Sequence, residues 1–329
     1  MALGTDIYST RGGVAVYGVE LVAAQGGVLC VVDRHLRSVE LVQSRFGGYP
    51  DETLVVLGDV YHIVARQAIV HVELRGRGYA AARSAVAVSD SPTGPFRYLR
   101  SMRPDAGQLP FDMTAEERAV LDTLDAAKYA RWWTPEWREA IRKGLFVKRD
   151  LEGGQMARDM QLFVDDDGKA YHIFSSEDNL TLHIAELSDD YLSHTGKYVR
   201  VAPGGHNEAP ALFKKDGVYW MITSGCTGWD PNEARLFSAP SIWGPWTQLP
   251  NPCVGPKSEI TFGGQSTFVL RLPGADDRFI FMADIWRPKH PSDARYIWLP
   301  VRFKEGVPYV EWMDQWNLGF FDRPIVEQE

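Results

Sequence analysis

From about residue 156 onward, short apolar and aromatic runs alternate with turn signals. Two such pairs of runs cover residues 160–174 and 211–222, and they are interrupted at 165–168 and 215–217 by segments that end in Asp-Gly. An Asp-Gly dipeptide between strand-like runs provides the positive φ angles of a tight turn. We therefore predict two β-hairpins here, and a further strand at 278–282 that follows the turn Ala275-Asp276-Asp277.

Two repeats along the chain indicate how these hairpins are organised. The turn glycines Gly168 and Gly217 are 49 residues apart, and a Ser-x-x-Gly-Pro-aromatic pattern at 91–96 recurs 150 residues later at 241–246. Self-similarity near 50 residues, built from hairpins, is typical of the four-stranded blades of a β-propeller. The 329 residues allow about five blades at this length. We predict one all-β domain over 1–329, a five-bladed β-propeller; coincidental similarity among unrelated strands is the alternative.

A helical insert interrupts the strand pattern at about residues 113–146. Thr114-Ala115-Glu116-Glu117 has the form of a capping box, and Val120, Leu121, Leu124 and Ala127 follow on one helical face. Thr134-Pro135 then predicts a second helix start, with proline at the first helical position. The insert also carries three tryptophans, for which packing against the propeller is favoured over lining the rim of a cavity: Trp132, Trp133 and Trp137.

Composition and charge exclude several classes of protein. The chain is 45% hydrophobic with a net charge of −8, so it lacks the basic character of a nucleic-acid or anionic-membrane binder. No run of 18 apolar residues occurs, and three cysteines cannot form a disulfide framework. The N-terminus has no secretory signal pattern, so we expect a cytoplasmic protein, or a secreted one if the true N-terminus is missing.

Two carboxylates occupy equivalent positions at the starts of successive predicted blades. Asp159 directly precedes the strand at 160–164, and Glu208 stands 49 residues later, which matches the hairpin repeat. The repeat therefore directs both carboxylates toward one axis. Cleavage of a glycosidic bond uses one protonated carboxyl group with a nearby charge that raises its pKa. The alternative is a pair of surface carboxylates at strand starts.

Several motifs resemble glycoside hydrolase family 43, and more narrowly its branch of exo-β-1,3-galactanases with relatives that act on arabinofuranosides and galactofuranosides. The resemblance covers about residues 77–325, and the motifs that carry it are 159–171, 206–210, Ser224-Gly225-Cys226-Thr227-Gly228-Trp229 and Gly264-Gln265-Ser266-Thr267-Phe268. The resemblance implies the five-bladed β-propeller fold of the family and hydrolysis of the glycosidic bond with inversion at the anomeric carbon. The resemblance implies an oligosaccharide or polysaccharide substrate and no cofactor.

The resemblance also implies roles for individual residues. Glu208 matches the general acid, and Asp159 matches the carboxylate that tunes the pKa of that acid and orients it. The branch lacks the usual aspartate base; Gln265 matches a glutamine thought to position the water, although an amide is a poor base. Asn179 and Thr227 match sugar-contacting positions.

Three further residues are candidates for substrate binding, each with a structural alternative. His206 either lines the pocket or supports Glu208, Trp229 either stacks on a sugar or packs in the core, and Arg295 either reaches the cavity or pairs at a blade edge. We expect no metal site, because the eight histidines are scattered without metal-ligand spacing.

The predicted first blade, at about residues 10–80, departs from the pattern of the family. It has no tryptophan and no lysine, and the acidic substrate contact expected before residue 80 has only Glu40, Glu52 and Glu73 as candidates. Strong divergence is one interpretation; translation in a shifted reading frame is the other, and the coding DNA would distinguish them.

We therefore expect an exo-acting, inverting glycosidase that removes terminal galactose or arabinofuranose from plant polysaccharides. A catalytically impaired, carbohydrate-binding propeller with a defective first blade is the alternative from another class. A non-enzymatic scaffold for protein partners is a third hypothesis, although such a scaffold has no need of Glu208, Asp159 and Gln265 together.

Overall fold

The computed structural model describes residues 80–274, 277–287 and 289–322, together with the backbone of four short strands nearer the N-terminus. Those four strands are β1 (Gly13–Val14), β2 (Leu21–Ala24), β3 (Val28–Val32) and β4 (Val39–Glu40). The later strands are β5 (Ser84–Ser89), β6 (Arg97–Met102), β7 (Met160–Val164), β8 (Ala170–Ser176), β9 (Thr181–Leu187), β10 (His194–Val201), β11 (Asn207–Lys215), β12 (Val218–Gly225), β13 (Arg235–Ala239), β14 (Thr247–Leu249), β15 (Cys253–Val254), β16 (Gln265–Arg271), β17 (Phe279–Ile285), β18 (Arg295–Lys304) and β19 (Val307–Glu311).

The strands form sheets in the order of the chain. β7 to β10 form one antiparallel sheet, β11 to β14 form the next, and β16 to β19 form a third, with β15 added in parallel beside β19. A further sheet has the order β2-β3-β5-β6, in which β3 pairs with β5 in parallel. The prediction of a mostly β protein built from consecutive small antiparallel sheets is therefore confirmed.

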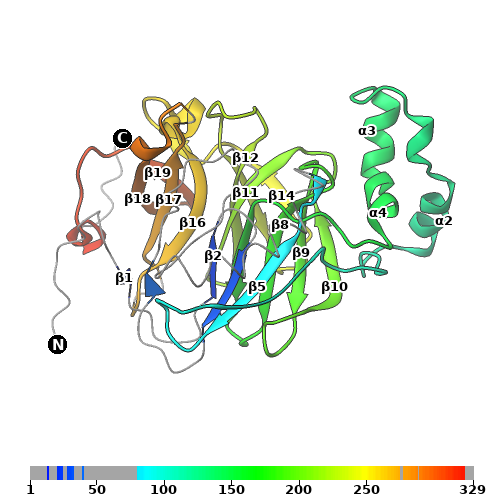
Figure 1. Ribbon diagram of the computed structural model, residues 1–329. Helices are drawn as coiled ribbons and strands as arrows, with labels where there is room; N and C mark the ends of the chain where they lie inside the picture. Colours follow the sequence, from blue (N-terminus) through cyan, green and yellow to red (C-terminus); the bar gives the residue numbers. More distant parts are fainter. Residues whose placement is uncertain are drawn as a thin grey trace.

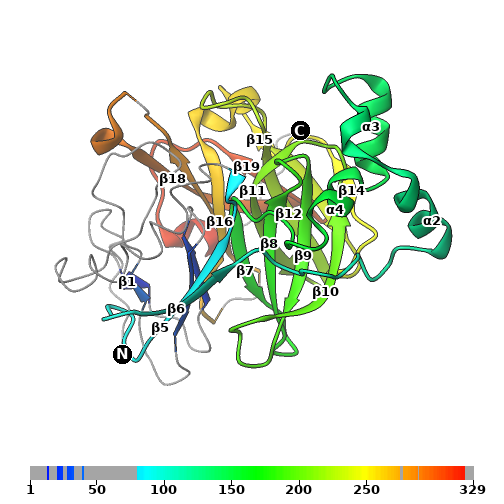
Figure 2. The same ribbon diagram turned by 45° about the vertical axis from the view of Figure 1, so that its right-hand side comes forward.

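Apolar side chains fill the space between successive sheets. Val86 of β5 packs with Leu162 and Leu187 of the β7–β10 sheet, and Ile173 packs in turn with Met221 of the β11–β14 sheet. A third cluster joins that sheet to β16–β19. In Figures 1 and 2 the β16–β18 strands lie at one side of the molecule, and the helical insert projects from the opposite side, beyond β10.

Both predicted hairpins are present, with the turn conformation that Asp-Gly favours. β7 and β8 pair up to Val164 and Ala170, and Gly168 at the turn has a φ of 83°. β11 and β12 pair up to Lys215 and Val218 around Asp216-Gly217, whose φ angles are 51° and 77°. The strand predicted at 278–282 is β17; residues 275–276 of the turn before it lie outside the described residues.

The Ser-x-x-Gly-Pro-aromatic repeat forms the same turn twice. One copy joins β5 to β6 and the other joins β13 to β14, which are the outer strands of their sheets. The N–H of Gly94 donates to Ser91 O at 3.0 Å, and that of Gly244 donates to Ser241 O at 2.8 Å. The motif is therefore an outer turn that recurs from sheet to sheet.

The insert consists of α2 (Ala115–Thr123), a 3-10 turn, η3 (Ala126–Lys128), α3 (Pro135–Arg142) and α4 (Leu145–Asp150). Both predicted caps are confirmed: Thr114 and Glu117 exchange the two hydrogen bonds of a capping box, and Thr134 Oγ1 accepts from the N–H of Trp137. The predicted apolar face is only partly correct. Leu121 and Leu124 are buried. Val120 is exposed although it belongs to α2, and Ala127 is exposed beyond the end of α2 at Thr123.

The three tryptophans of the insert have different environments. Trp137 is 1% exposed and belongs to a buried cluster that joins Ile141 and Phe146 of the insert to Leu180, between β8 and β9, which agrees with packing against the sheets. Trp132 and Trp133 remain 49% and 48% exposed. The guanidinium of Arg200, on β10, donates to the carbonyls of Ile141 and Arg142 and so ties the end of α3 to the β7–β10 sheet.

No helix in the described ranges is long and apolar enough to cross a membrane. Apart from the backbone of β1 to β4, the predicted first blade lies outside the described residues, and so do the side chains of Glu40, Glu52 and Glu73.

Candidate active site

Glu208 lies near the start of β11, where the strand is irregular. It pairs with Ser224 of β12, and the register then shifts between Glu208 and Ala211 as in a β-bulge. Ala209 within this irregular stretch has a φ of 51°. Bulges re-aim side chains next to functional sites, and here the irregularity sets the direction of the Glu208 carboxylate.

The environment of Glu208 favours its protonated form near neutral pH. Burial and, secondly, the negative charge of Asp159 raise the pKa of Glu208 to about 7. Hydrogen bonds from the Cys226 thiol and the Asn179 side-chain amide oppose this rise without cancelling it. The result is a carboxylic acid that still holds its proton at a pH where an ordinary glutamate has lost it.

Asp159 stands immediately before β7, the position predicted from the sequence. Burial raises the pKa of Asp159, while a hydrogen bond from the backbone N–H of Ala209 and the positive charge of Arg158 lower it. Because Ala209 directly follows Glu208, this hydrogen bond joins the Asp159 carboxylate to the backbone that carries the acid. The two carboxylates placed together by the sequence repeat are thus electrostatically coupled.

Asn179 is aimed at Glu208 by an unusual turn between β8 and β9. Glu177, Asp178 and Asn179 have φ angles of 53°, 57° and 64°, the left-handed region that non-glycine residues seldom enter. An ion pair with a fully buried carboxylate supports this turn: Glu177 accepts from Arg200 at 2.7 and 2.9 Å. His183 hydrogen-bonds the same carboxylate at 3.1 Å.

Burial and the neighbouring groups have opposite effects on the pKa of Glu177. Burial by itself raises the pKa, but the charge of Arg200 and the hydrogen bonds from His183 and Arg200 lower it to about 2. Glu177 is therefore ionised at all ordinary pH values.

Gln265 begins β16 and is joined to the Glu208 region through Ser224. Its side-chain Nε2 donates to Ser224 Oγ at 2.8 Å, and Ser224 is the residue opposite Glu208 in the β11–β12 pair. The three residues thus link the sheet of β11–β14 to that of β16–β19.

Asp284, on β17, is a third carboxylate that the sequence motifs did not identify. It is the cross-strand partner of Gln265, so the two side chains lie on the same face of the sheet. Burial raises the pKa of Asp284 to about 6, and the charge of Asp159 adds to the rise. Its Oδ1 atom is buried without a hydrogen-bond partner in the part of the chain that the structure describes.

The sequence motifs also did not identify Cys226 and Ser224 as neighbours of Glu208. The Cys226 thiol hydrogen-bonds the Glu208 carboxylate, and burial together with that negative charge raises the pKa of the thiol. Extension of the β11–β12 hairpin from its turn was the one available signal, since it brings 224–226 close to Glu208.

Four other candidates are placed as follows. Thr227 is exposed and bonds within its own loop, to Asp230 O at 2.6 Å and Asn232 Nδ2 at 2.8 Å. Trp229 is 56% exposed, and its ring centroid lies 5.7 Å from that of Trp286. Arg295 is exposed and donates to Asp293, which corresponds to the blade-edge alternative.

His206, the fourth, lies two residues before the acid, and its ring centroid is 5.1 Å from that of Trp133. Burial and the charges of Arg235 and Arg138 lower its pKa, so the imidazole is neutral at neutral pH. A cavity of about 170 Å³ opens beside it, between the helical insert and the loop that precedes β11. Among the described residues, no three His, Cys, Asp or Glu side chains are grouped as metal ligands.

The chain matches known proteins over most of the described region. The model of the family "Glycosyl hydrolases family 43" matches residues 130–284. A solved GH43 β-1,3-galactosidase with galactodeoxynojirimycin is 66% identical, with a TM-score of 0.71 over 74% of this chain and 70% of that one. An exo-β-1,3-galactanase from Clostridium thermocellum is 31% identical, with a TM-score of 0.53 over 72% of this chain and 43% of that one.

One curated relative is a β-D-galactofuranosidase from Aspergillus niger (strain ATCC MYA-4892 / CBS 513.88 / FGSC A1513). It is 32% identical over an alignment of 129 positions, and the match covers 36% of this chain. The match spans 37% of the length of that relative.

Proposed function

Because the chain belongs to glycoside hydrolase family 43, we propose that it is an exo-acting, inverting glycosidase that releases terminal galactose from β-1,3-galactan side chains. The observation that carries the proposal is Glu208, a carboxyl group with a pKa of about 7 beside Asp159. The β-1,3-galactosidase with 66% identity supports the choice of sugar. The substrate is accordingly an oligosaccharide or polysaccharide.

In the proposed reaction, protonated Glu208 gives its proton to the glycosidic oxygen as the bond from that oxygen to the anomeric carbon breaks. Asp159 keeps the acid protonated until that step, because its negative charge opposes a second one nearby. Water attacks the anomeric carbon from the opposite face, as inversion requires. Gln265, oriented by Ser224, positions this water.

We assign the base to Asp284, since an amide is a weak proton acceptor. Asp284 is the cross-strand neighbour of Gln265, has a pKa of about 6 and carries a buried oxygen without a partner among the described residues. A base with a pKa near the working pH combines a deprotonated form with useful basicity. The proton of the attacking water passes to this carboxylate, and the acid–base pair returns to its starting state through solvent.

We propose that the sheets of the chain are blades of a five-bladed β-propeller, the fold predicted from the sequence repeats. The sheets β2-β3-β5-β6, β7–β10, β11–β14 and β15–β19 account for four blades of a propeller.

The test is sugar release from β-1,3-galactan oligosaccharides by the wild-type protein and by Glu208→Gln. Galactose release that falls by a factor of 10² or more in the variant supports the acid role, because general acid catalysis contributes about 10²–10⁴. NMR of the first-formed anomer reports inversion. Glu139→Gln, on the exposed side of α3, is the matched control and retains wild-type activity.

The galactofuranosidase relative favours a second candidate substrate, a terminal galactofuranoside or arabinofuranoside. Release of a furanose and no galactose would select it. A folded protein that binds these oligosaccharides without releasing sugar would instead be a carbohydrate-binding propeller with an impaired first blade. Absence of both binding and release would favour a scaffold.

A further inference from the structure

The cavity of about 170 Å³ between the helical insert and the loop before β11 has no acidic side chain in its walls. Four apolar side chains, two glycines and two basic side chains line it: Trp133, Trp137, Ile141, Leu180, Gly204, Gly205, Arg138 and His206. The chain as a whole has a net charge of −8. The cavity is therefore a local exception, and its polar character comes from a guanidinium and an imidazole.

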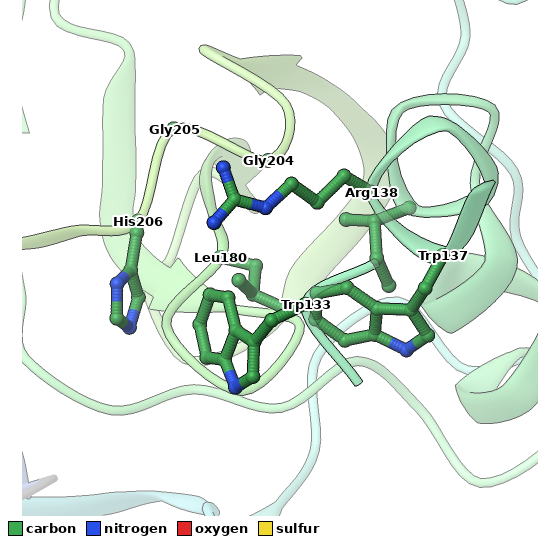
Figure 3. Close-up of a pocket in the computed structure, with 8 residues that line it drawn as sticks. Trp133, Trp137, Arg138, Leu180, Gly204, Gly205 and His206 are labelled. Atoms are coloured by element: carbon green, nitrogen blue, oxygen red, sulfur yellow. The ribbon is translucent and has the colours of Figure 1, made fainter. Parts of the chain in front are cut away.

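The Arg138 guanidinium is directed into this cavity and has no carboxylate partner among the described residues. Figure 3 shows its side chain extending from α3 toward Gly205 and His206, above the Trp133 ring. Its Cζ atom lies 5.8 Å from the centroid of that ring, so the aromatic face helps to hold the cation in place. A guanidinium that is held but not paired suits a carboxylate ligand, which it can bind through two parallel hydrogen bonds.

A second guanidinium adds positive charge behind the cavity. Arg235, on β13, donates to the carbonyls of Gly205 and His206 at 2.8 and 2.9 Å. Burial and the charges of Arg235 and Arg138 lower the pKa of His206, which shows that both cations act on the cavity. Their charges favour an anionic ligand, and the neutral imidazole can both donate a hydrogen bond and accept one.

Trp133 adds an aromatic surface in an unusual backbone conformation. Its φ of 70° lies in the left-handed region, which bulky residues rarely enter. The ring is 48% exposed, and its centroid lies 5.1 Å from that of His206. Strained conformations of this kind cluster at ligand-binding sites, where the surrounding structure maintains them. An exposed tryptophan face can pack against the C–H groups of a sugar ring.

We propose that this cavity is a binding site for a hexuronic acid unit, separate from the residues of the proposed reaction. The carboxylate of the sugar pairs with Arg138, its ring lies against Trp133 and Leu180, and its hydroxyl groups bond to His206. A cavity of about 150 Å³ accepts one six-membered ring. The choice of a sugar as the carrier of the carboxylate rests on the proposed function, because a protein that acts on polysaccharides meets anions in that form.

Titration with methyl β-D-glucuronide and methyl β-D-glucoside, followed by ligand-observed NMR, tests the site. The two compounds differ only in the carboxylate, so wild-type protein should bind the glucuronide about ten times more tightly or better. Arg138→Gln should remove this preference, and Trp133→Ala should weaken glucuronide binding by about tenfold or more. Melting temperatures show whether each variant is folded, and Arg138 is exposed, so its result stands even if Trp133→Ala is unstable.

Each test variant has a matched control in the same insert. Arg142, on the same helix as Arg138, is already paired with Glu139, so Arg142→Gln should retain the affinity for the glucuronide. Trp132 is as exposed as Trp133 but stacks on Trp137, with ring centroids 5.3 Å apart, and does not line the cavity. Trp132→Ala should therefore also bind the glucuronide as wild type does.

Glu208→Gln separates the site from the proposed reaction. This substitution changes the proposed acid and no residue of the cavity, so it should bind the glucuronide as wild type does, whether or not wild type releases galactose. Loss of glucuronide binding in Glu208→Gln would place the ligand at the acid and overturn the assignment. No binding of the glucuronide, equal binding of the two glycosides, or a preference that survives in Arg138→Gln would overturn it as well.

Discussion

The side-chain amide of Asn179 donates a hydrogen bond to the carboxylate of Glu208, although the two residues belong to different sheets and are separated by 29 positions. Asp159 has the opposite effect on the pKa of the same carboxylate. The hydrogen bond stabilises the ionised form of Glu208 and lowers its pKa, whereas the charge of Asp159 raises it. The two neighbours therefore lead to opposite predictions for the pH dependence of the enzyme.

Asn179→Ala is expected to shift the alkaline limb of the kcat/KM profile to higher pH. Loss of the hydrogen bond raises the pKa of Glu208, so the acid keeps its proton longer as the pH rises. Hydrogen bonds to charged groups contribute roughly 1.5–3 kcal/mol, so for this partly exposed group we expect a shift of about one pH unit. Asn251→Ala, in a loop that bonds Ser258, is the control and leaves the limb in place.

Asp159→Asn is expected to move the same limb to lower pH. Removal of the negative charge favours ionisation of Glu208, so the fraction of protonated acid at neutral pH decreases. The residual activity should therefore have its optimum below that of wild type. The same pH profile of kcat/KM measures the effect, and a limb that stays fixed or moves upward would contradict the role given to Asp159.

Asp284→Asn tests the proposed base. Its activity on galactan oligosaccharides should fall by about 10²-fold or more, and the acid limb set by a pKa of about 6 should disappear. Azide, a nucleophile that needs no deprotonation, should restore turnover and yield the α-galactosyl azide. Full activity of Asp284→Asn, or a lost activity that azide does not rescue, would return the role to Gln265.

Asp105→Asn should stabilise the protein at alkaline pH. Burial raises the pKa of Asp105 to about 7, and neither carboxylate oxygen has a partner among the described residues. Because the folded pKa lies above the unfolded one, Asp105 does not destabilise the wild type below about pH 4, and its destabilising effect grows as the pH rises and is complete above about 7.

For Asp105→Asn we expect a melting temperature several degrees above wild type at pH 8 and a smaller difference at pH 5, measured by calorimetry. The exposed Asp189→Asn variant should show no such pH dependence. An Asp105→Asn variant that melts below the wild type at both pH values would show that the carboxylate has a stabilising partner.

Glu177→Gln should lower the free energy of unfolding by about 3 kcal/mol, because the mostly buried guanidinium of Arg200 then loses its charge partner. The Glu177 pKa of about 2 is below the unfolded value, so this stabilisation is present at neutral pH and is lost only as the pH falls from about 4.5 toward 2.

Urea unfolding at pH 7 measures the change in Glu177→Gln. The exposed pair of Glu139 with Arg142 provides the control, and Glu139→Gln should cost less than about 1 kcal/mol. A Glu177→Gln loss as small as that of Glu139→Gln would show that the buried pair does not support the turn that holds Asn179.

The sequence determined the features that depend on neighbouring residues. Asp216-Gly217 specifies its hairpin, Thr114 and Glu117 specify the start of a helix, and the Ser-x-x-Gly-Pro pattern specifies an outer turn, because the hydrogen bonds involved close within a few residues. The repeat length also related Asp159 to Glu208, since equivalent positions in successive sheets occupy similar places in space.

Only the tertiary structure decided which side chains meet around the acid. Simple extension of the hairpin from its turn, where Lys215 pairs with Val218, places Gly225 opposite Glu208; the irregularity before Ala211 shifts the partner to Ser224. The contact of Trp133 with His206 and the pairing of Gln265 with Asp284 likewise depend on distant segments. Such contacts are set by strand register and by the packing of sheets and insert, which no local pattern of residues encodes.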